Sequence, residues 1–86
     1  MIELFEEDYE TIKSTLMITI CEKKKGNIAN LNEIIESYQG YHKEEVVKKS
    51  IDRYGKENGF YDVMMEERIL TENGIKECQK QMPGQS

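Results

Sequence analysis

The sequence predicts a mainly helical α+β domain with a small β-ribbon, in the order helix, short strand, helix, helix, strand, strand, helix. Two observations support this order. Apolar residues recur at helical spacing in three segments before residue 58, and each of these segments ends at a glycine. From residue 60 the pattern changes to strand-forming residues on either side of a charged break, and a short helical segment follows.

Length and composition indicate one soluble domain with a single core. The chain has 86 residues, of which 37% are hydrophobic and 34% are charged, so it has no room for a separate substrate domain. We expect one domain over residues 1–86, with an acidic lead-in at residues 1–7 and a flexible tail at residues 82–86. No apolar run approaches the roughly 20 residues of a membrane span, and no basic segment begins a signal peptide. The expectation is a cytoplasmic protein without a membrane partner.

The first helix is expected from about Tyr9 to Lys24. Asp8 is a suitable N-cap, and the acids beside it complement the dipole of a helix start. The helix should end where three lysines precede Gly26, because basic residues followed by glycine are typical of a helix C-terminus. Its core side is an apolar stripe at helical spacing, formed by Tyr9, Ile12, Leu16, Ile20 and Cys21.

A short strand and a second helix should follow. The connector from Asn27 to Ala29 is expected to pair with the later ribbon. Asn30 is the expected N-cap of the second helix, and Glu33 completes a capping box. The helix should end near residue 40 at a tight turn. Its apolar stripe is Leu31, Ile34, Ile35 and Tyr38. Tyr38 and Tyr41 are both expected to pack in the core or the turn.

The third helix is expected to span about His42 to Glu57. Its core side carries Val47, Ser50, Ile51 and Tyr54. Asn58-Gly59 should end it, because glycine adopts the positive φ of a helix C-terminus at little cost.

The ribbon is expected as two strands, from Phe60 to Met65 and then at Ile69-Leu70. Glu66-Glu67 lies between them. Neither residue favours a two-residue turn, so we expect a wider loop from Met65 to Arg68.

Thr71 is expected to cap a last helix, and Leu70 and Ile75 are spaced for a hydrophobic staple across its start. Ile75 and Cys78 should then face the core together. A competing interpretation is a type I′ hairpin turn at Asn73-Gly74. The cap and the staple favour the helix, since the residues around that turn are less strand-like.

The two cysteines, Cys21 and Cys78, lie far apart and neither belongs to a CxxC pair. With one histidine in the chain, a zinc site is not expected. Both cysteines fall on apolar helix stripes, so we expect buried, reduced thiols that pack as small hydrophobic side chains. A disulfide between them requires the first and last helices to pack together.

No residue pattern indicates catalysis. The serines have no histidine at a useful spacing, so a nucleophile, a base and an orienting group are not found together. The sequence holds no P-loop and no dinucleotide-binding fingerprint. We therefore expect a protein that is not an enzyme and that needs no metal and no cofactor.

The stretch Leu70-Thr71-Glu72-Asn73-Gly74-Ile75-Lys76 resembles the L-T-x-x-G segment that closes the wing in many bacterial and archaeal winged-helix regulators, such as the MarR and PadR types. Asn58-Gly59-Phe60 resembles the step that leaves their recognition helix. The order of elements from about Tyr9 to Gln81 is that of a winged helix-turn-helix. The resemblance implies a recognition helix from about His42, a wing from Met64 to Ile69, and dimeric binding to double-stranded DNA. A homodimer would use the N-terminal segment or the last helix.

The candidate DNA-binding residues are basic side chains on the third helix and the ribbon: His42, Lys43, Lys49, Arg53, Lys56 and Arg68. Four of them, at positions 42, 49, 53 and 56, fall within a sector of about 60° on a helix. Lysine and arginine suit guanine edges and phosphates in the major groove. However, the net charge is −5, the first ten residues hold five acids, and Glu66-Glu67 would face phosphates at the wing tip.

These observations predict a small winged-helix DNA-binding protein that regulates transcription. The alternative is a winged-helix protein-interaction module, such as an antirepressor or an assembly subunit. Its contact surface would be the acidic first ten residues, the acidic wing and Met64-Met65. A continuous positive strip along the third helix would favour DNA, whereas a broken strip beside an exposed apolar patch would favour a protein partner.

Overall fold

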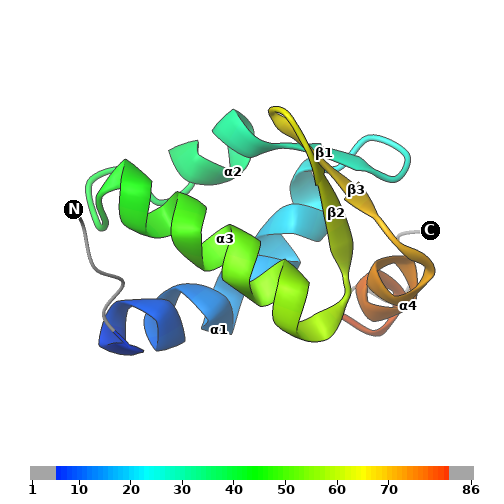
Figure 1. Cartoon of the computed structure of the whole chain (residues 1–86), viewed down its shortest axis with the longest axis horizontal. Helices are drawn as coiled ribbons and strands as arrows, with labels where there is room; N and C mark the ends of the chain where they lie inside the picture. The colour runs from blue at the N-terminus through cyan, green and yellow to red at the C-terminus, as the bar shows by residue number, and fades with distance from the viewer. Residues whose placement is uncertain (1–5, 82–86) are drawn as a thin grey trace.

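The computed structural model describes residues 6–81, so the predicted tail at 82–86 and residues 1–5 of the predicted lead-in lie outside this range. Its elements are α1 (Glu6–Lys23), β1 (Ile28–Asn30), α2 (Leu31–Glu36), α3 (Glu44–Asn58), β2 (Tyr61–Met64), β3 (Glu67–Leu70) and α4 (Glu72–Gln81). The three strands lie toward one end of the molecule, above α4 (Figure 1). This arrangement confirms the predicted fold class, a mainly helical α+β domain with a small antiparallel sheet, in the expected element order.

The core is built around α1. All five residues of its predicted stripe are buried, with exposed fractions of 6% or less, and Met17 joins them. The helix begins earlier than predicted, because Glu6, Glu7 and Asp8 form its first turn and do not precede it. Acids in a first turn complement the helix dipole, so this start is electrostatically favourable.

The three strands form an antiparallel sheet in the order β1-β3-β2. Ile28 pairs with Ile69 across β1 and β3, and Tyr61 pairs with Leu70 across β2 and β3. The short strand predicted before the second helix is therefore confirmed. Since β3 is central, β1 and β2 are the edges of the described sheet.

The turn between β2 and β3 is tighter than predicted. Met64 pairs with Glu67, so only Met65 and Glu66 connect the strands, and the expected wider loop is wrong. Met65 has a φ of 54°, a conformation that methionine rarely adopts. A two-residue hairpin turn requires a positive φ at its first central residue, and Met65 occupies that position. Arg68 donates hydrogen bonds from Nη1 to the carbonyl oxygens of Met65 (3.0 Å) and Glu67 (2.9 Å), and these bonds brace the tight connection.

α2 is short, and its predicted N-cap is confirmed. The backbone N–H of Glu33 donates to Asn30 Oδ1 at 3.2 Å. Tyr38, just beyond the helix, is buried as expected, and its hydroxyl lies 3.0 Å from that of Thr15 on α1. Tyr41 is not packed. It is 83% exposed, which corrects the prediction, because the chain turns outward after Gly40 at a φ of 87°.

α3 begins at Glu44, two residues later than predicted, and Lys43 occupies its N-cap position. The helix ends as predicted at Gly59, which has a φ of 66°. Val47, Ser50 and Ile51 are completely buried. Gly55 is required on this face, since a Cβ atom there would collide with the ring of Tyr61.

α4 confirms the helical interpretation of the last segment over a hairpin at Asn73-Gly74. The N–H of Gly74 donates to Thr71 Oγ1 at 3.3 Å, as expected of an N-cap. The side of the helix that faces the core was predicted correctly at Cys78 but not at Ile75. Gly74 and Cys78 are buried, whereas Ile75 is 39% exposed. The reason is the close approach of Gly74 to the carbonyl of Phe60, which any side chain at that position would block.

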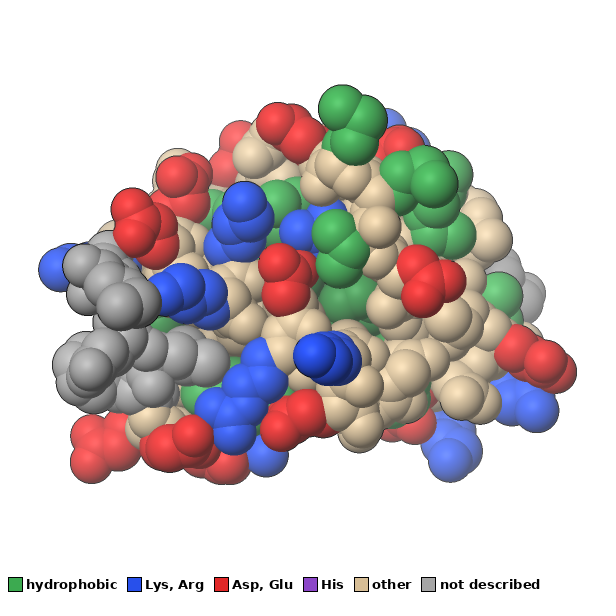
Figure 2. All heavy atoms as spheres, viewed as in Figure 1, with side chains coloured by type: hydrophobic (Ala, Val, Ile, Leu, Met, Phe, Trp, Pro, Cys, Tyr) green, Lys and Arg blue, Asp and Glu red, His purple; other side chains and the backbone are tan. Residues whose placement is uncertain are grey.

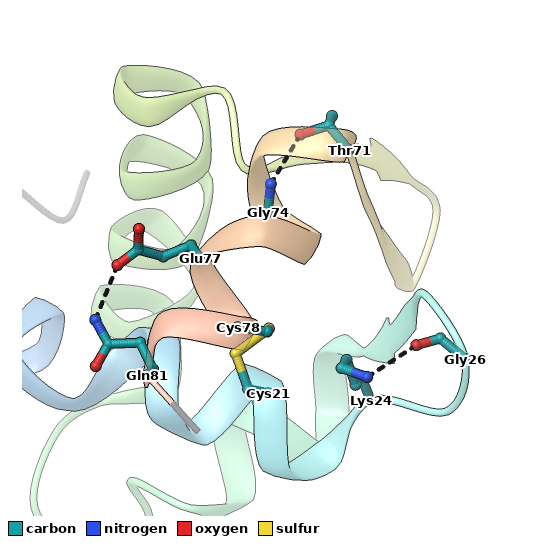
Figure 3. The surroundings of a disulfide bond; sticks show 8 residues. All are labelled: Cys21, Lys24, Gly26, Thr71, Gly74, Glu77, Cys78 and Gln81. Atoms are coloured by element: carbon teal, nitrogen blue, oxygen red, sulfur yellow. Dashed lines mark hydrogen bonds between the residues drawn. A yellow bond between two sulfur atoms is a disulfide. The ribbon is translucent and has the colours of Figure 1, made fainter. Parts of the chain in front are cut away.

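A disulfide joins Cys21 of α1 to Cys78 of α4 (Figure 3), with a Cα–Cα distance of 5.6 Å. Burial of both cysteines was predicted correctly, but the expectation of reduced thiols is wrong. The two helices pack together, which is the condition that the disulfide needed. The bond spans 57 positions of sequence, and cross-linking a loop of that length stabilises a fold by about 4 kcal/mol through the unfolded chain.

Candidate functional site

The outward side of α3 is the position at which a winged helix would read DNA. At 100° per residue, five side chains point away from the buried side of this helix. We call them the α3 ridge: Glu45, Lys48, Lys49, Asp52 and Lys56. The three lysines are exposed, but acids interrupt them. Figure 2 shows the same mixture, with blue and red side chains interleaved over α3. The positive strip is therefore broken.

Lys48 was not among the predicted DNA-binding residues. It lies beside Lys49, on the side of the ridge nearer the sheet. Its spacing of four residues from Asp52 could have indicated that both share one face.

Arg53 holds α1 against α3 and does not point freely outward. Its guanidinium lies 4.0 Å from the centre of the Tyr9 ring, and its Nη1 lies 2.8 Å from Glu6 Oε1. Its Nε lies 3.4 Å from Glu57 Oε2, and the Tyr9 hydroxyl donates to the other oxygen of Glu57. Three of the partners of Arg53 thus belong to the two helices that meet here.

This cluster changes the acid–base properties of its members. The hydrogen bond from Tyr9 lowers the pKa of Glu57 below its ordinary value of 4.5, and Arg53 adds to the effect. Burial raises the pKa of Tyr9, and the hydrogen bond to Glu57 raises it further. The hydrogen bond to Glu6 raises the pKa of Arg53. The positive charge of Arg53 is thus balanced within the cluster by two carboxylates, those of Glu6 and Glu57.

Arg68 is buried, with 1% of its side chain exposed. Its Nε lies 3.0 Å from Asp52 Oδ1, so the side chain crosses from β3 to α3. Together with its two bonds to hairpin carbonyls, this pairing fixes the hairpin to the helix. The sequence predicted Arg68 as a DNA-binding cation of the wing. This prediction is corrected, because its guanidinium is buried and paired with Asp52.

The remaining candidates lie around the start of α3. His42 precedes the helix, and its Nδ1 lies 3.6 Å from Asp8 Oδ1 of α1. Lys43 is exposed at the N-cap position. The structure therefore brings only Lys49 and Lys56 of the predicted set together on the ridge, with Lys43 at its beginning.

The β2–β3 hairpin exposes three consecutive apolar side chains. Val63 is 59% exposed, Met64 is 57% exposed and Met65 is 89% exposed. We call these three residues the hairpin patch. Figure 2 shows green side chains over the top of the molecule, where the hairpin lies. Asp62 precedes the patch, and Glu66 and Glu67 follow it, all exposed. An exposed apolar patch with a polar rim is typical of a protein contact surface.

Between residues 6 and 81, no cluster of three or more His, Cys, Asp or Glu side chains is arranged to hold a metal ion. Within the same range, no helix has the length and apolar character needed to cross a membrane. Neither observation adds a further site to the two surfaces described above.

Comparison with models of protein families, with curated proteins and with solved structures gave no match to this chain. The fold class follows from the arrangement of its own helices and strands. Its function has to be inferred from the α3 ridge and the hairpin patch.

Proposed function

We propose that this chain is a winged-helix protein-interaction domain that acts through its β2–β3 hairpin. The observation that carries the proposal is the hairpin patch, which exposes Val63, Met64 and Met65 in succession. Methionine side chains are flexible and polarisable and adapt to the shape of a partner. Acids on both sides of the patch would repel DNA phosphates at the place where a wing usually meets the backbone.

The intramolecular contacts of three predicted DNA-binding residues also support the proposal. Arg53 and Arg68 each bridge two elements through ion pairs, and His42 lies against Asp8. An arginine that contacts a phosphate must leave such partners, and a buried arginine must also break several hydrogen bonds. These three side chains therefore contribute to the stability of the fold more than to an external surface.

A second candidate function is DNA binding by α3, as in the transcriptional regulator expected from the sequence. It is favoured by one observation: Lys48, Lys49 and Lys56 lie on the outward ridge of the helix. The negative charge of Asp52 between them is partly offset by Arg68. In this case the ridge would enter the major groove, and the hairpin would stay off the backbone.

A titration with mixed-sequence duplex DNA, first at low salt and then at higher salt, separates the two functions. For a protein-interaction domain we expect no binding even at low salt, where the phosphate contribution is largest. Low-salt binding that is lost in the triple variant Lys48→Ala, Lys49→Ala, Lys56→Ala would overturn the proposal in favour of DNA. The matched control is Lys76→Ala with Lys80→Ala on α4, which removes exposed lysines away from the ridge.

Photo-crosslinking in cells tests whether the hairpin contacts a protein partner. A photoreactive residue in place of Met65 should capture one reproducible protein, and the same residue in place of Glu10 on α1 should not. The captured protein, once purified, should bind the wild-type chain and should bind the Met64→Ser, Met65→Ser variant less tightly. Equal binding to both would show that the hairpin is not the contact surface.

A further inference from the structure

One side of the sheet is left uncovered. Side chains alternate across a strand, so the paired Ile28 and Ile69 lie on the same side as Met64, while Ala29 and Arg68 lie on the other. Ala29 and Arg68 are completely or almost completely buried, and Arg68 reaches Asp52 of α3. Their side is therefore the inner one. On the outer side, Ile28 is 37% exposed and Met64 is 57% exposed.

A hollow adjoins this outer side at its β1 edge. Its volume is about 300 Å³, comparable to the smallest ligand pockets and large enough for one or two side chains of a partner. It is lined by Lys23, Lys25, Ile28, Asn30, Glu33 and Glu67. Because Ile28 and Glu67 also belong to the outer side of the sheet, the hollow and the sheet form one continuous surface.

Acids dominate the hairpin end of this surface. Asp62, Glu66 and Glu67 are exposed around the hairpin patch. Glu66 accepts a hydrogen bond from Asn32 Nδ2 at 3.0 Å, which leaves its charge at the surface. A partner that brings lysine or arginine together with apolar side chains would complement both features.

A second copy of the chain does not fit this description. A two-fold contact centred on the hairpin would place Glu66 and Glu67 near the same acids of the other copy. The net charge of −5 adds a general repulsion between copies. The charge pattern thus favours a different, basic chain.

We infer that the outer sheet side, together with Met64 and Met65 of the hairpin, forms one docking surface for a basic, apolar segment of another protein. In this surface Met64 and Met65 contact the apolar side chains of the segment, and the acids beside them pair with its cations. The hollow is lined by two lysines as well as two glutamates, so it accepts an apolar side chain of the segment and not a cation. The inference rests on the proposed function and specifies the chemistry of the partner.

Titration of the isotope-labelled chain by NMR with two synthetic octapeptides tests the inference, since NMR detects weak binding. The first peptide repeats Lys-Val-Lys-Leu, and the second carries Glu in place of each Lys. We expect the lysine peptide alone to shift the amide signals of Ile28, Ile69 and the hairpin. The Met64→Ser, Met65→Ser variant should bind it roughly tenfold more weakly, and Glu67→Gln with Asp62→Asn should also weaken it. The matched control, Glu44→Gln with Glu45→Gln at the start of α3, should bind like the wild type.

Several outcomes would overturn the inference. No binding of the lysine peptide, equal binding of both peptides, or shifts that lie away from the hairpin would each contradict it. A dimer that forms through the hairpin, seen by sedimentation and lost in the Met64→Ser, Met65→Ser variant, would make a second copy the occupant and leave the interaction function intact. Low-salt DNA binding through the ridge lysines, in contrast, would overturn the proposed function itself.

Discussion

The α1–α3 interface and the β2–β3 hairpin each contain an arginine and large apolar or aromatic side chains. The two regions differ in which of these side chains are exposed to water. In the interface, Arg53 stacks on Tyr9 and pairs with carboxylates of both helices. In the hairpin, Arg68 turns inward to Asp52, and the apolar Met65 is 89% exposed. The two arginines are thus paired with carboxylates within the fold, whereas Met65 is left in water.

This difference distinguishes residues that stabilise the fold from exposed residues that are available to bind a partner. Removing a buried or paired arginine destabilises the folded protein, because the hydrogen-bond partners of the arginine are left unsatisfied. An exposed methionine at a hairpin tip contributes little to folding, since unfolding does not expose it further. Substitutions in the two regions should therefore separate stability from binding.

Loss of the Cys21–Cys78 disulfide is expected to have the largest effect. The bond closes a loop of 57 positions, and its reduction should lower the free energy of unfolding by about 4 kcal/mol. Denaturant unfolding with and without reductant measures this difference. In the Cys21→Ala, Cys78→Ala variant the reductant should have no further effect. If reduction changed the wild type by less than about 1 kcal/mol, the two helices would be held mainly by packing.

The same measurement bears on where the protein resides. Disulfides persist in oxidising compartments and, in hyperthermophiles, inside the cell, whereas ordinary cytosol keeps thiols reduced. The sequence-based expectation of a cytoplasmic protein therefore requires a reduced form that still folds or an unusual intracellular redox state. Rapid acid quenching of cells, followed by thiol labelling of the extracted protein, would measure whether the two cysteines are reduced or oxidised and so distinguish these cases.

Removal of the Arg68 side chain is expected to have the next largest effect. Arg68→Ala should lower the free energy of unfolding by about 3 kcal/mol, because it breaks the pairing with Asp52 and two hydrogen bonds to hairpin carbonyls. Lys56→Ala on the exposed ridge of α3 is the control and should change stability by less than about 0.5 kcal/mol. Similar small effects for both variants would show that the Arg68 guanidinium is solvated.

Tyr9→Phe is expected to have a smaller, pH-dependent effect. At neutral pH it should cost about 1 kcal/mol through the lost hydrogen bond to Glu57. Since the fold lowers the pKa of Glu57 below 4.5, its stabilising contribution is present above that pH and is lost as the pH falls through the lowered value. Melting temperatures measured between about pH 6 and pH 3 should therefore fall more steeply in the wild type than in the variant.

The control for that experiment is Tyr41→Phe, which removes a hydroxyl from a side chain that is 83% exposed. Its melting temperature should follow the wild-type pH dependence throughout. Parallel curves for the wild type and Tyr9→Phe would mean that Glu57 is stabilised by other contacts, such as Arg53.

Local signals account for the parts of the structure that the sequence predicted. The α1 stripe depends on helical spacing, and the caps at Asn30 and Thr71 depend on residues three positions away. Two of the incorrect predictions involve contacts between distant segments. The burial of Arg68 depends on Asp52 of another element, and the exposure of Ile75 depends on the packing of Gly74 against Phe60.

The candidate site shows the same division. The position of Lys49 and Lys56 on one outward face follows from helical geometry and was predicted. The engagement of Arg53 with Glu6 could not be predicted, because the pair lies 47 positions apart and forms only when α1 packs on α3. Charge counting along the sequence treats all these cations alike, although the fold buries Arg68 and pairs Arg53 with two carboxylates.

The smallest effect on stability is expected for Met64→Ser with Met65→Ser. Both side chains are largely exposed, so the double variant should unfold within about 0.5 kcal/mol of the wild type. A related substitution, Met65→Gly, should stabilise the hairpin, because glycine adopts the φ of 54° at this position without strain. The variants should nevertheless lose the binding that the exposed patch provides. A large loss of stability in the serine variant would instead show that the two methionines pack within the fold, and it would remove the main reason to assign them to a partner.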